Sequence, residues 1–303
     1  MKLLINNQNV NFTLENEKNL GDVVAGINKW LKGSGFNITD LRIDDEPLNL
    51  EEKETWQGRS IDSIDTLYVN VKHITELRIA NLETVLQYLN LLKKAIQDEN
   101  RALYSELVPG FPFMLESLKN NFLIETNNVE SDTFPGNEIL HPIPIEKITQ
   151  LEEQEKSEYL KRIKIIEESL VTAIRDIENP KESLNTLTEE LKKASEGISE
   201  VSILLQTGRD REAMGNIIKF SNLTGRLFRI LSSLSSSGVV NINELKIGNK
   251  SSKEFYEELN SNLKELIEAF KTNDSVLIGD LLEYEIAPRI EMLIALAREI
   301  QIS

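Results

Sequence analysis

The spacing of hydrophobic residues changes at about residue 72 of this 303-residue chain. Before that point, apolar and polar residues alternate around residues 3–14, and strand-like stretches follow at 38–44 and 66–71. Such alternation is typical of half-buried β-strands. After it, apolar residues recur every three or four positions, as in amphipathic helices. The pattern predicts an α+β protein with two domains, residues 1–72 and 73–303.

A single helix is predicted within the first domain, after a β-hairpin whose tip is expected at residues 7–9 (Asn-Gln-Asn). The stretch LGDVVAGINKWLKG (20–33) has helical spacing, Asn19 as a candidate N-cap and Gly33 as a candidate stop. The apolar residues at helical spacing in this stretch are Leu20, Val23, Val24, Ile27, Trp30 and Leu31.

The order of these elements resembles ubiquitin. DLRIDDEPL (40–48) lies where that family has its third strand and following turn, and SIDSIDTLYVNV (60–71) resembles its short helical turn and last strand. The resemblance implies that residues 1–72 form a ubiquitin-like β-grasp domain. Conjugation is not expected, because Val71-Lys72-His73 leads into a helix where the family has a free diglycine tail. Polar Arg42 and Asn70 replace aliphatic residues of the family's recognition patch. The domain would cap the helical part or dock a partner.

The second domain is predicted to be all-α and built from antiparallel helical hairpins. A long loop is expected at 123–145 and a flexible, serine-rich tract at 231–250. The expected helices cover residues 74–97, a region from about 100 that weakens at Pro109 and Pro112, 146–178, 180–207, the stretch from 211 to the serine-rich tract, 252–272 and 275–301. This part resembles helical proteins of low-GC bacteria, and that resemblance implies no activity.

Three stretches of the second domain share one pattern, which suggests a repeated αα-hairpin. Each has a helix, a polar turn with a capping residue, and a second helix with a small residue five positions after the cap. The caps are expected at Asn100, Asp210 and Asp274, and the small residues, expected to admit a close neighbouring helix, are Ser105, Gly215 and Gly279. Each second helix also has a weak point, at Pro109 and Pro112, at Gly225 and at Pro288. Pro288 is expected to kink its helix, because proline cannot bond the carbonyl of Tyr284.

Composition and charge exclude several classes of function. The formal net charge is −16, which argues against a nucleic-acid partner. The chain has no cysteine, so disulfides and thiolate chemistry are absent. No apolar run approaches the length of a membrane-spanning helix, and MKLLINNQN does not read as a signal peptide, so a cytoplasmic protein without membrane insertion is expected.

No catalytic, cofactor-binding or metal-binding set is predicted. The two histidines, His73 and His141, are too few for a histidine-rich metal site and are expected to be structural. The acids of TNDSVLIGDLLEYEIAP (272–288) are expected on a hydrated helix face, with Glu285 and Arg289 forming an i,i+4 ion pair. No cofactor is expected.

The leading hypothesis is a non-enzymatic protein that acts as an interaction scaffold, adaptor or chaperone-like factor for another protein; self-association is a further hypothesis. The candidate interaction residues are His141, Pro142 and Pro144 in the long loop, and Tyr284 and Pro288 beside the expected kink. The alternative is an enzyme or small-ligand-binding protein with a site at the domain junction near His73, or at the Pro288 kink.

Overall fold

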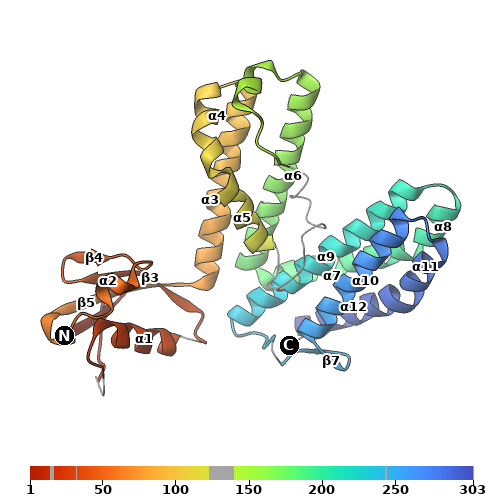
Figure 1. The fold of residues 1–303 in the computed structure, drawn as a ribbon. Coiled ribbons are helices and arrows are strands. Elements are labelled where there is room, and N and C mark those ends of the chain that lie inside the picture. The colour runs from red at the N-terminus through yellow and green to blue at the C-terminus, as the bar shows by residue number, and fades with distance from the viewer. Residues whose placement is uncertain (14–16, 32, 123–139, 243, 303) are drawn as a thin grey trace. The chain divides into compact units, whose positions relative to one another are not determined.

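The computed structural model describes residues 1–13, 17–31, 33–122, 140–242 and 244–302 (Figure 1). These residues form two compact units, Met1–Ala80 and Asn81–Ser303. An N-terminal mixed sheet precedes a mostly helical body, so the protein is α+β, as the hydrophobic pattern predicts.

The N-terminal unit contains a five-stranded sheet of order β2-β1-β5-β3-β4, in which β1 runs parallel to β5 and the other neighbours are antiparallel. The strands are β1 (Lys2–Ile5), β2 (Gln8–Val10), β3 (Phe36–Ile43), β4 (Glu46–Leu48) and β5 (Thr66–His73). Helix α1 (Leu20–Leu31) buries its apolar face with the sheet, where Leu20, Leu41 and Leu67 are fully buried. The unit also has a short helix α2 (Lys53–Trp56), which the sequence did not suggest, and a 3₁₀ turn η1 (Ile61–Ser63).

The local predictions for this unit are partly confirmed and partly wrong. The predicted Asn19 cap is confirmed, because its Oδ1 accepts the Asp22 amide at 2.9 Å. The predicted hairpin tip is wrong: Ile5 pairs with Gln8, and Asn6 and Asn7 make the turn at φ 49° and 65°. This left-handed conformation suits asparagine. Trp30 shares the helical spacing of the buried apolar residues, but it is 68% exposed.

The second unit is helical in its described part, apart from a small β6–β7 hairpin. The helices are α3 (Ile74–Gln97), which begins in the first unit, α4 (Arg101–Leu107), α5 (Phe111–Phe122), α6 (Glu153–Glu178), α7 (Pro180–Ser199), α8 (Val201–Gln206), α9 (Asp210–Ser236), α10 (Ser252–Lys271), α11 (Ser275–Asp280) and α12 (Ala287–Ile302). Short 3₁₀ turns occur at η2 (Val108–Gly110) and η3 (Ile145–Gln150), a π-helical turn occurs at η4 (Leu281–Ile286), and the hairpin strands are β6 (Lys246–Ile247) and β7 (Lys250–Ser251). The helix predicted from 146 begins as η3 and becomes α-helical only at Glu153.

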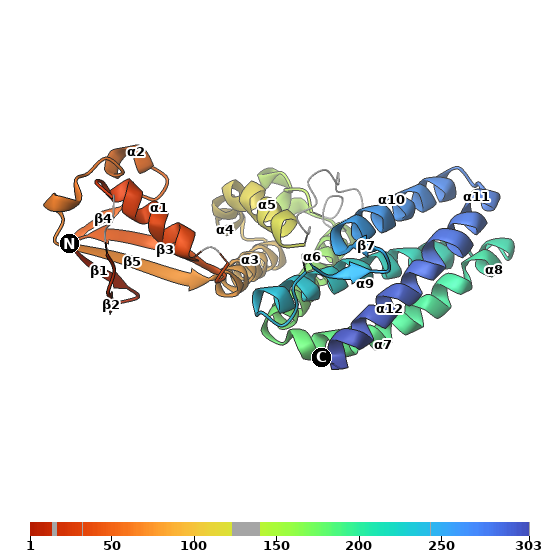
Figure 2. The same ribbon diagram turned by 90° about the horizontal axis from the view of Figure 1, so that it is seen from below.

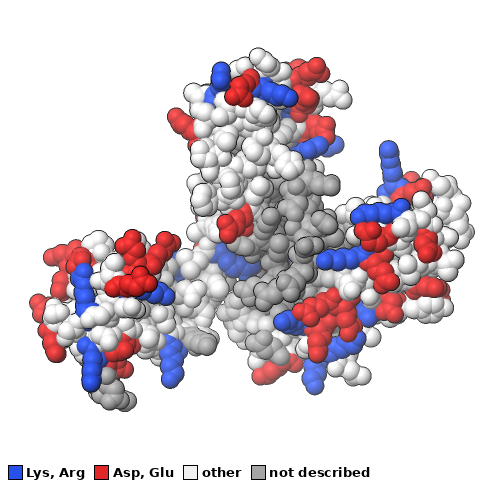
Figure 3. All heavy atoms as spheres, in the orientation of Figure 1, with Lys and Arg blue, Asp and Glu red and all other residues white. Residues whose placement is uncertain are grey.

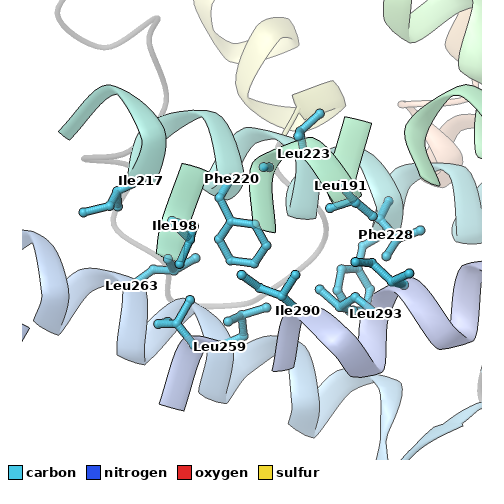
Figure 4. Close-up of a cluster of buried hydrophobic side chains, with 14 of the residues drawn as sticks. Leu191, Ile198, Ile217, Phe220, Leu223, Phe228, Leu259, Leu263, Ile290 and Leu293 are labelled. Atoms are coloured by element: carbon cyan, nitrogen blue, oxygen red, sulfur yellow. The ribbon is translucent and has the colours of Figure 1, made fainter. Parts of the chain in front are cut away.

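Helices α7, α9, α10 and α12 surround one hydrophobic core (Figure 4). Leu191 of α7, Phe220 of α9, Leu259 of α10 and Ile290 of α12 are all fully buried there. Figure 2 shows α12 on an outer side of this bundle. The inner face of α12 packs in the core, so the residues on its opposite face remain at the surface.

The predicted flexible tract at 231–250 is wrong over its first part. Helix α9 continues to Ser236 and buries Leu231 and Leu234. The serines fit inside the helix because their hydroxyls bond the carbonyl four residues earlier, as Ser233 does to Arg229 at 3.1 Å. Gly238, at φ 73°, then ends the helix.

The three predicted hairpins share one turn, although the second is shifted by a residue. Glu99, Gly208 and Asn273 have φ of 52°, 72° and 54°. The next residue in each case donates its amide to a carbonyl five residues back, at 2.8, 2.8 and 2.9 Å. This is the Schellman helix ending, and here the same residue also starts the following helix.

The capping predictions for these turns are confirmed at two positions and wrong at the third. Asn100 Oδ1 accepts the Leu103 amide and Asp274 Oδ1 accepts the Leu277 amide, both at 3.0 Å. At the second turn the N-cap is Arg209, without a side-chain cap bond, and Asp210 lies inside the helix. Gly208 takes the left-handed position there, which moves the helix start one residue earlier than the alignment implied.

The proposed close-packing role is also wrong for the two glycines among the small residues. A Cβ added at Gly215 or Gly279 would meet nothing within 4 Å, apart from the backbone of its own helix. Gly225, the expected weak point of its helix, lies within an unbroken α9. The glycine spacing therefore does not report helix–helix approach in these hairpins.

Candidate functional site

Tyrosine hydroxyls hold the backbone of residues 140–144, Leu-His-Pro-Ile-Pro. Tyr104 in α4 accepts a hydrogen bond from the Ile143 amide at 2.7 Å and donates one to the Ile143 carbonyl at 2.9 Å. Tyr159 in α6 donates to the His141 carbonyl at 2.8 Å. Three hydrogen bonds from two helices thus determine the course of this segment.

The side chains of the segment divide between core and solvent. Leu140 is buried at one end, and Ile148 of η3 is fully buried just beyond the other. Between them His141, Pro142 and Pro144 are exposed. Pro144 has φ −53° and ψ 132°, near the polyproline II values. The candidate residues from the loop are therefore at the surface on an anchored backbone, while the preceding predicted loop residues, 123–139, lie outside the described residues.

Loss of solvation extends the pH range over which the anchoring tyrosines stay neutral and can donate their hydroxyl protons. Loss of solvation raises the pKa of Tyr159, with the nearby Tyr104 and Tyr88 adding to the effect. Burial likewise raises the pKa of Tyr104, and it raises the pKa of Tyr88 to about 12. The hydroxyl of Tyr88 donates to the Leu107 carbonyl at 2.8 Å. The two hydroxyls that bind the segment therefore stay protonated to a higher pH than a solvated tyrosine does, and so does that of Tyr88.

Tyr284 and Pro288, the other two candidate residues, lie at a π-helical turn. Residues 281–286 form this turn, and the Ala287 amide bonds the Leu282 carbonyl five residues back. A π turn accommodates the missing amide of Pro288 without ending the helix, because it shifts the hydrogen-bond pattern by one residue. The structure thus has a π turn just before the proline at which a kink was predicted.

Arg289 reinforces the π turn from the side. Its Nη1 donates to the Glu285 main-chain carbonyl at 2.7 Å and to the Glu285 carboxylate at 2.6 Å, which confirms the predicted ion pair. Asn262 of α10 donates to the same carboxylate at 3.2 Å, and Glu258 pairs with Arg289 at 3.3 Å. This network joins α10 to the π turn.

The face assignment for α11 and α12 is confirmed. The stripe predicted to be buried is buried throughout: Ile278, Leu282, Ile286, Ile290, Leu293, Ala297 and Ile300. Asp280, Glu283 and Glu291 are exposed, so these carboxylates are hydrated as expected. Tyr284 is 64% exposed. The sequence reasoning missed Met292, one turn beyond Pro288, which is 44% exposed on the same side.

His73, near which the alternative site was placed, acts as a helix cap. Its Nδ1 lies 2.6 Å from Thr75 Oγ1 and accepts the Thr75 amide at 3.3 Å. The ring meets Phe36 edge-on at 5.1 Å between centroids. A Cβ on Gly35 would lie 2.5 Å from Nε2, so that nitrogen packs against the chain. His73 thus has a structural role within the N-terminal unit.

The sequence did not predict an ion cluster that forms around the buried carboxylate of Asp176. Arg226 of α9 binds the Asp176 carboxylate with Nε and Nη2, both at 2.9 Å, and reaches Glu190 of α7 at 2.8 Å with Nη1. The Asp176 side chain is 2% exposed. The available signal was a charged residue within the apolar stripe of α6, between Ala173 and Ile177. The cluster connects α6, α7 and α9, and its members are occupied with one another.

The described residues contain neither a cluster of metal-ligating side chains nor a membrane-spanning helix. In the ranges given above, no three side chains among His, Asp and Glu are grouped as metal ligands. In those same ranges, no helix combines the length and the apolar character needed to cross a bilayer.

Comparison with known proteins finds relatives without an assigned activity. Residues 1–73 match the family model "TP0873 N-terminal domain", and residues 182–295 match "Domain of unknown function (DUF8042)". An uncharacterized protein of Treponema pallidum (strain Nichols) is 27% identical over 106 residues, covering 35% of this chain. The match covers 52% of that relative, so the chain spans about half its length. No solved structure gives a significant match.

Proposed function

We propose that this protein is a non-enzymatic interaction protein that binds another protein through residues 141–144. The observation that carries the proposal is the exposure of His141, Pro142 and Pro144 on a backbone anchored by Tyr104 and Tyr159. Extended proline-containing segments dock in aromatic-lined grooves, and they bind with less entropy loss when their conformation is already set. The segment has this character, because three hydrogen bonds hold its backbone before a partner arrives.

We further propose that the N-terminal unit is a ubiquitin-like β-grasp domain. Its sheet order, with a parallel β1–β5 pair, and helix α1 packed on the sheet support this assignment. The Arg42 guanidinium lies 4.1 Å from the centre of the Tyr68 ring, where the family has aliphatic contacts. A partner of this face would therefore differ chemically from the partners of ubiquitin.

Affinity capture with the full-length chain tests the interaction. The bait is incubated with a lysate of the cells that produce the protein, and bound proteins are quantified by mass spectrometry. The triple substitution His141→Ala, Pro142→Ala and Pro144→Ala should reduce the enriched partner at least fivefold, since it removes exposed side chains and leaves the core intact. Tyr104→Phe should also reduce capture, because it frees the Ile143 amide and carbonyl.

Pro112→Ala provides a matched control, since Pro112 is an exposed proline on α5, outside the segment. It should retain the partner at the wild-type level. Equal capture by the wild type and the triple variant, or no enriched protein at all, would overturn the assignment to residues 141–144.

A further inference from the structure

The outer face of α11, η4 and α12 carries an apolar stripe that is exposed to solvent, with Met292 lying beside Gly248 of the β6–β7 turn. Tyr284, Pro288, Met292 and Ala295 are exposed and follow one another at intervals of four, four and three residues. Residues at these intervals share one side of a helix. Tyr284 and Met292 are 64% and 44% exposed, so two large side chains lie in this stripe.

The stripe is additional to the face that the bundle uses. Ile286, Ile290, Leu293 and Ala297 are fully buried on the opposite side of the same helix. A helix that packs against one core needs one apolar stripe, and polar residues are expected on its other face. The second stripe therefore requires an explanation beyond the folding of the bundle.

The π turn supports a binding role for this face. π turns inside α-helices occur frequently at functional sites. This π turn is stabilised by Arg289, which binds the main-chain carbonyl and the carboxylate of Glu285. The carboxylate of Glu285 is therefore paired with a cation of its own helix. Methionine adapts its shape to different apolar partners, and tyrosine is enriched at interface hot spots.

The charges beside the stripe define the chemistry of its partner. Asp280, Glu283 and Glu291 are exposed along one edge, and Glu299 lies near its end. Arg298 is the one exposed cation among the described residues of α11, η4 and α12. Figure 3 shows acidic side chains over the α10 and α12 region, with basic ones between them. A second copy docked on the same face would bring like acids together, which disfavours self-association.

We propose that this face, Tyr284, Pro288, Met292 and Ala295 with the acids Asp280, Glu283 and Glu291, binds a basic amphipathic helix of another protein. The apolar side of that helix packs on the stripe, and its Lys and Arg residues face the acids. The inference does not depend on the segment 141–144, and the variants there should leave it unchanged.

Peptide titration against the full-length chain tests the proposal. The probe is a fluorescein-labelled 14-residue amphipathic peptide of leucine and lysine, followed by fluorescence anisotropy. Met292→Lys and the double substitution Glu283→Lys with Glu291→Lys should each raise the Kd at least tenfold. The first substitution places a positive charge in the apolar stripe, and the second reverses the charge of two acidic residues beside it.

Matched variants separate this site from general attraction to an acidic protein. Glu153→Lys with Glu155→Lys changes the net charge equally on exposed positions of α6, and Val171→Lys alters an exposed apolar residue of the same helix. These controls should change the Kd less than twofold. Circular dichroism and Tm confirm that each variant is folded.

Three outcomes would overturn the proposal. The peptide could fail to bind, or the α6 variants could weaken binding as much as the stripe variants do. Sedimentation could instead reveal a dimer that Met292→Lys dissociates, which would assign the face to a second copy of the chain.

Discussion

At the scale of single residues, short-range capping chemistry is readable from the sequence. Asn19, Asn100 and Asp274 each cap a helix through a bond to an amide three residues ahead. Such a bond depends on local conformation alone. Asp210 was misassigned because Gly208 takes the left-handed position, which makes Arg209 the N-cap, one residue earlier than predicted.

The glycines give a direct test at this scale. Gly279→Ala should stabilise the protein by roughly 0.5–1 kcal/mol, because alanine has the higher helix propensity and its Cβ enters open space. We expect a rise in Tm of about 2 °C by differential scanning calorimetry.

Gly35→Ala is the opposite control, because Gly35 has φ 76° and its Cβ would lie 2.5 Å from His73 Nε2. That substitution should lower Tm. A fall in Tm for Gly279→Ala would instead restore the close-packing role first suggested by its position.

At the scale of elements, the hairpins reuse one turn geometry with different sequences. Glutamate, glycine and asparagine occupy the same left-handed position at 99, 208 and 273. Residue identity at that position therefore obscures the repeat, while the backbone bonds reveal it. The serine-rich end of α9 shows the same limit, because serine composition favoured a flexible tract but the buried leucines at helical spacing extend the helix.

The capping bonds should differ in their contribution to stability. Asn100→Ala and Asp274→Ala should each cost about 1 kcal/mol, because each leaves the first amides of its helix without a side-chain acceptor. Asp210→Ala should cost less than half as much, since Asp210 makes no cap bond. Urea unfolding of the three variants measures this order, and an equal loss from Asp210→Ala would contradict it.

At the scale of the whole molecule, a stability loss in alkali is predicted from one buried tyrosine, Tyr104, and two half-buried ones, Tyr88 and Tyr159. Burial raises the pKa of Tyr88 to about 12 and raises those of Tyr104 and Tyr159. An unfolded tyrosine ionises near pH 10, so the unfolded chain releases protons first as the pH rises. The stabilisation is complete below about pH 10 and should be lost as the pH approaches 12.

Urea midpoints between pH 8 and pH 12 measure this loss, and absorbance at 295 nm follows phenolate formation. Tyr159→Phe should show a smaller alkaline decrease than the wild type, because one of the three raised groups is removed. A decrease of the same size in both proteins would assign the effect to other groups.

The candidate sites were only partly predictable. His141, Pro142, Pro144, Tyr284 and Pro288 are exposed, as interaction residues must be, and the sequence identified them as breaks or aromatic positions. The long-range contacts of the structure were not predictable. The hydroxyl of Tyr104 meets Ile143 from 39 residues away, and Arg226 meets Asp176 across 50. No local pattern encodes such separations.

The sequence by itself determined the α+β class, most helix bounds and the buried stripe of α12. These depend on the period of apolar residues and on bonds within a few positions. Only the tertiary structure decided that Trp30 is exposed, that tyrosines anchor residues 141–144, and that α12 has a second apolar stripe facing solvent. Those properties depend on which surfaces of distant elements meet, and a helix's apolar face becomes core or remains free only once its neighbours are in place.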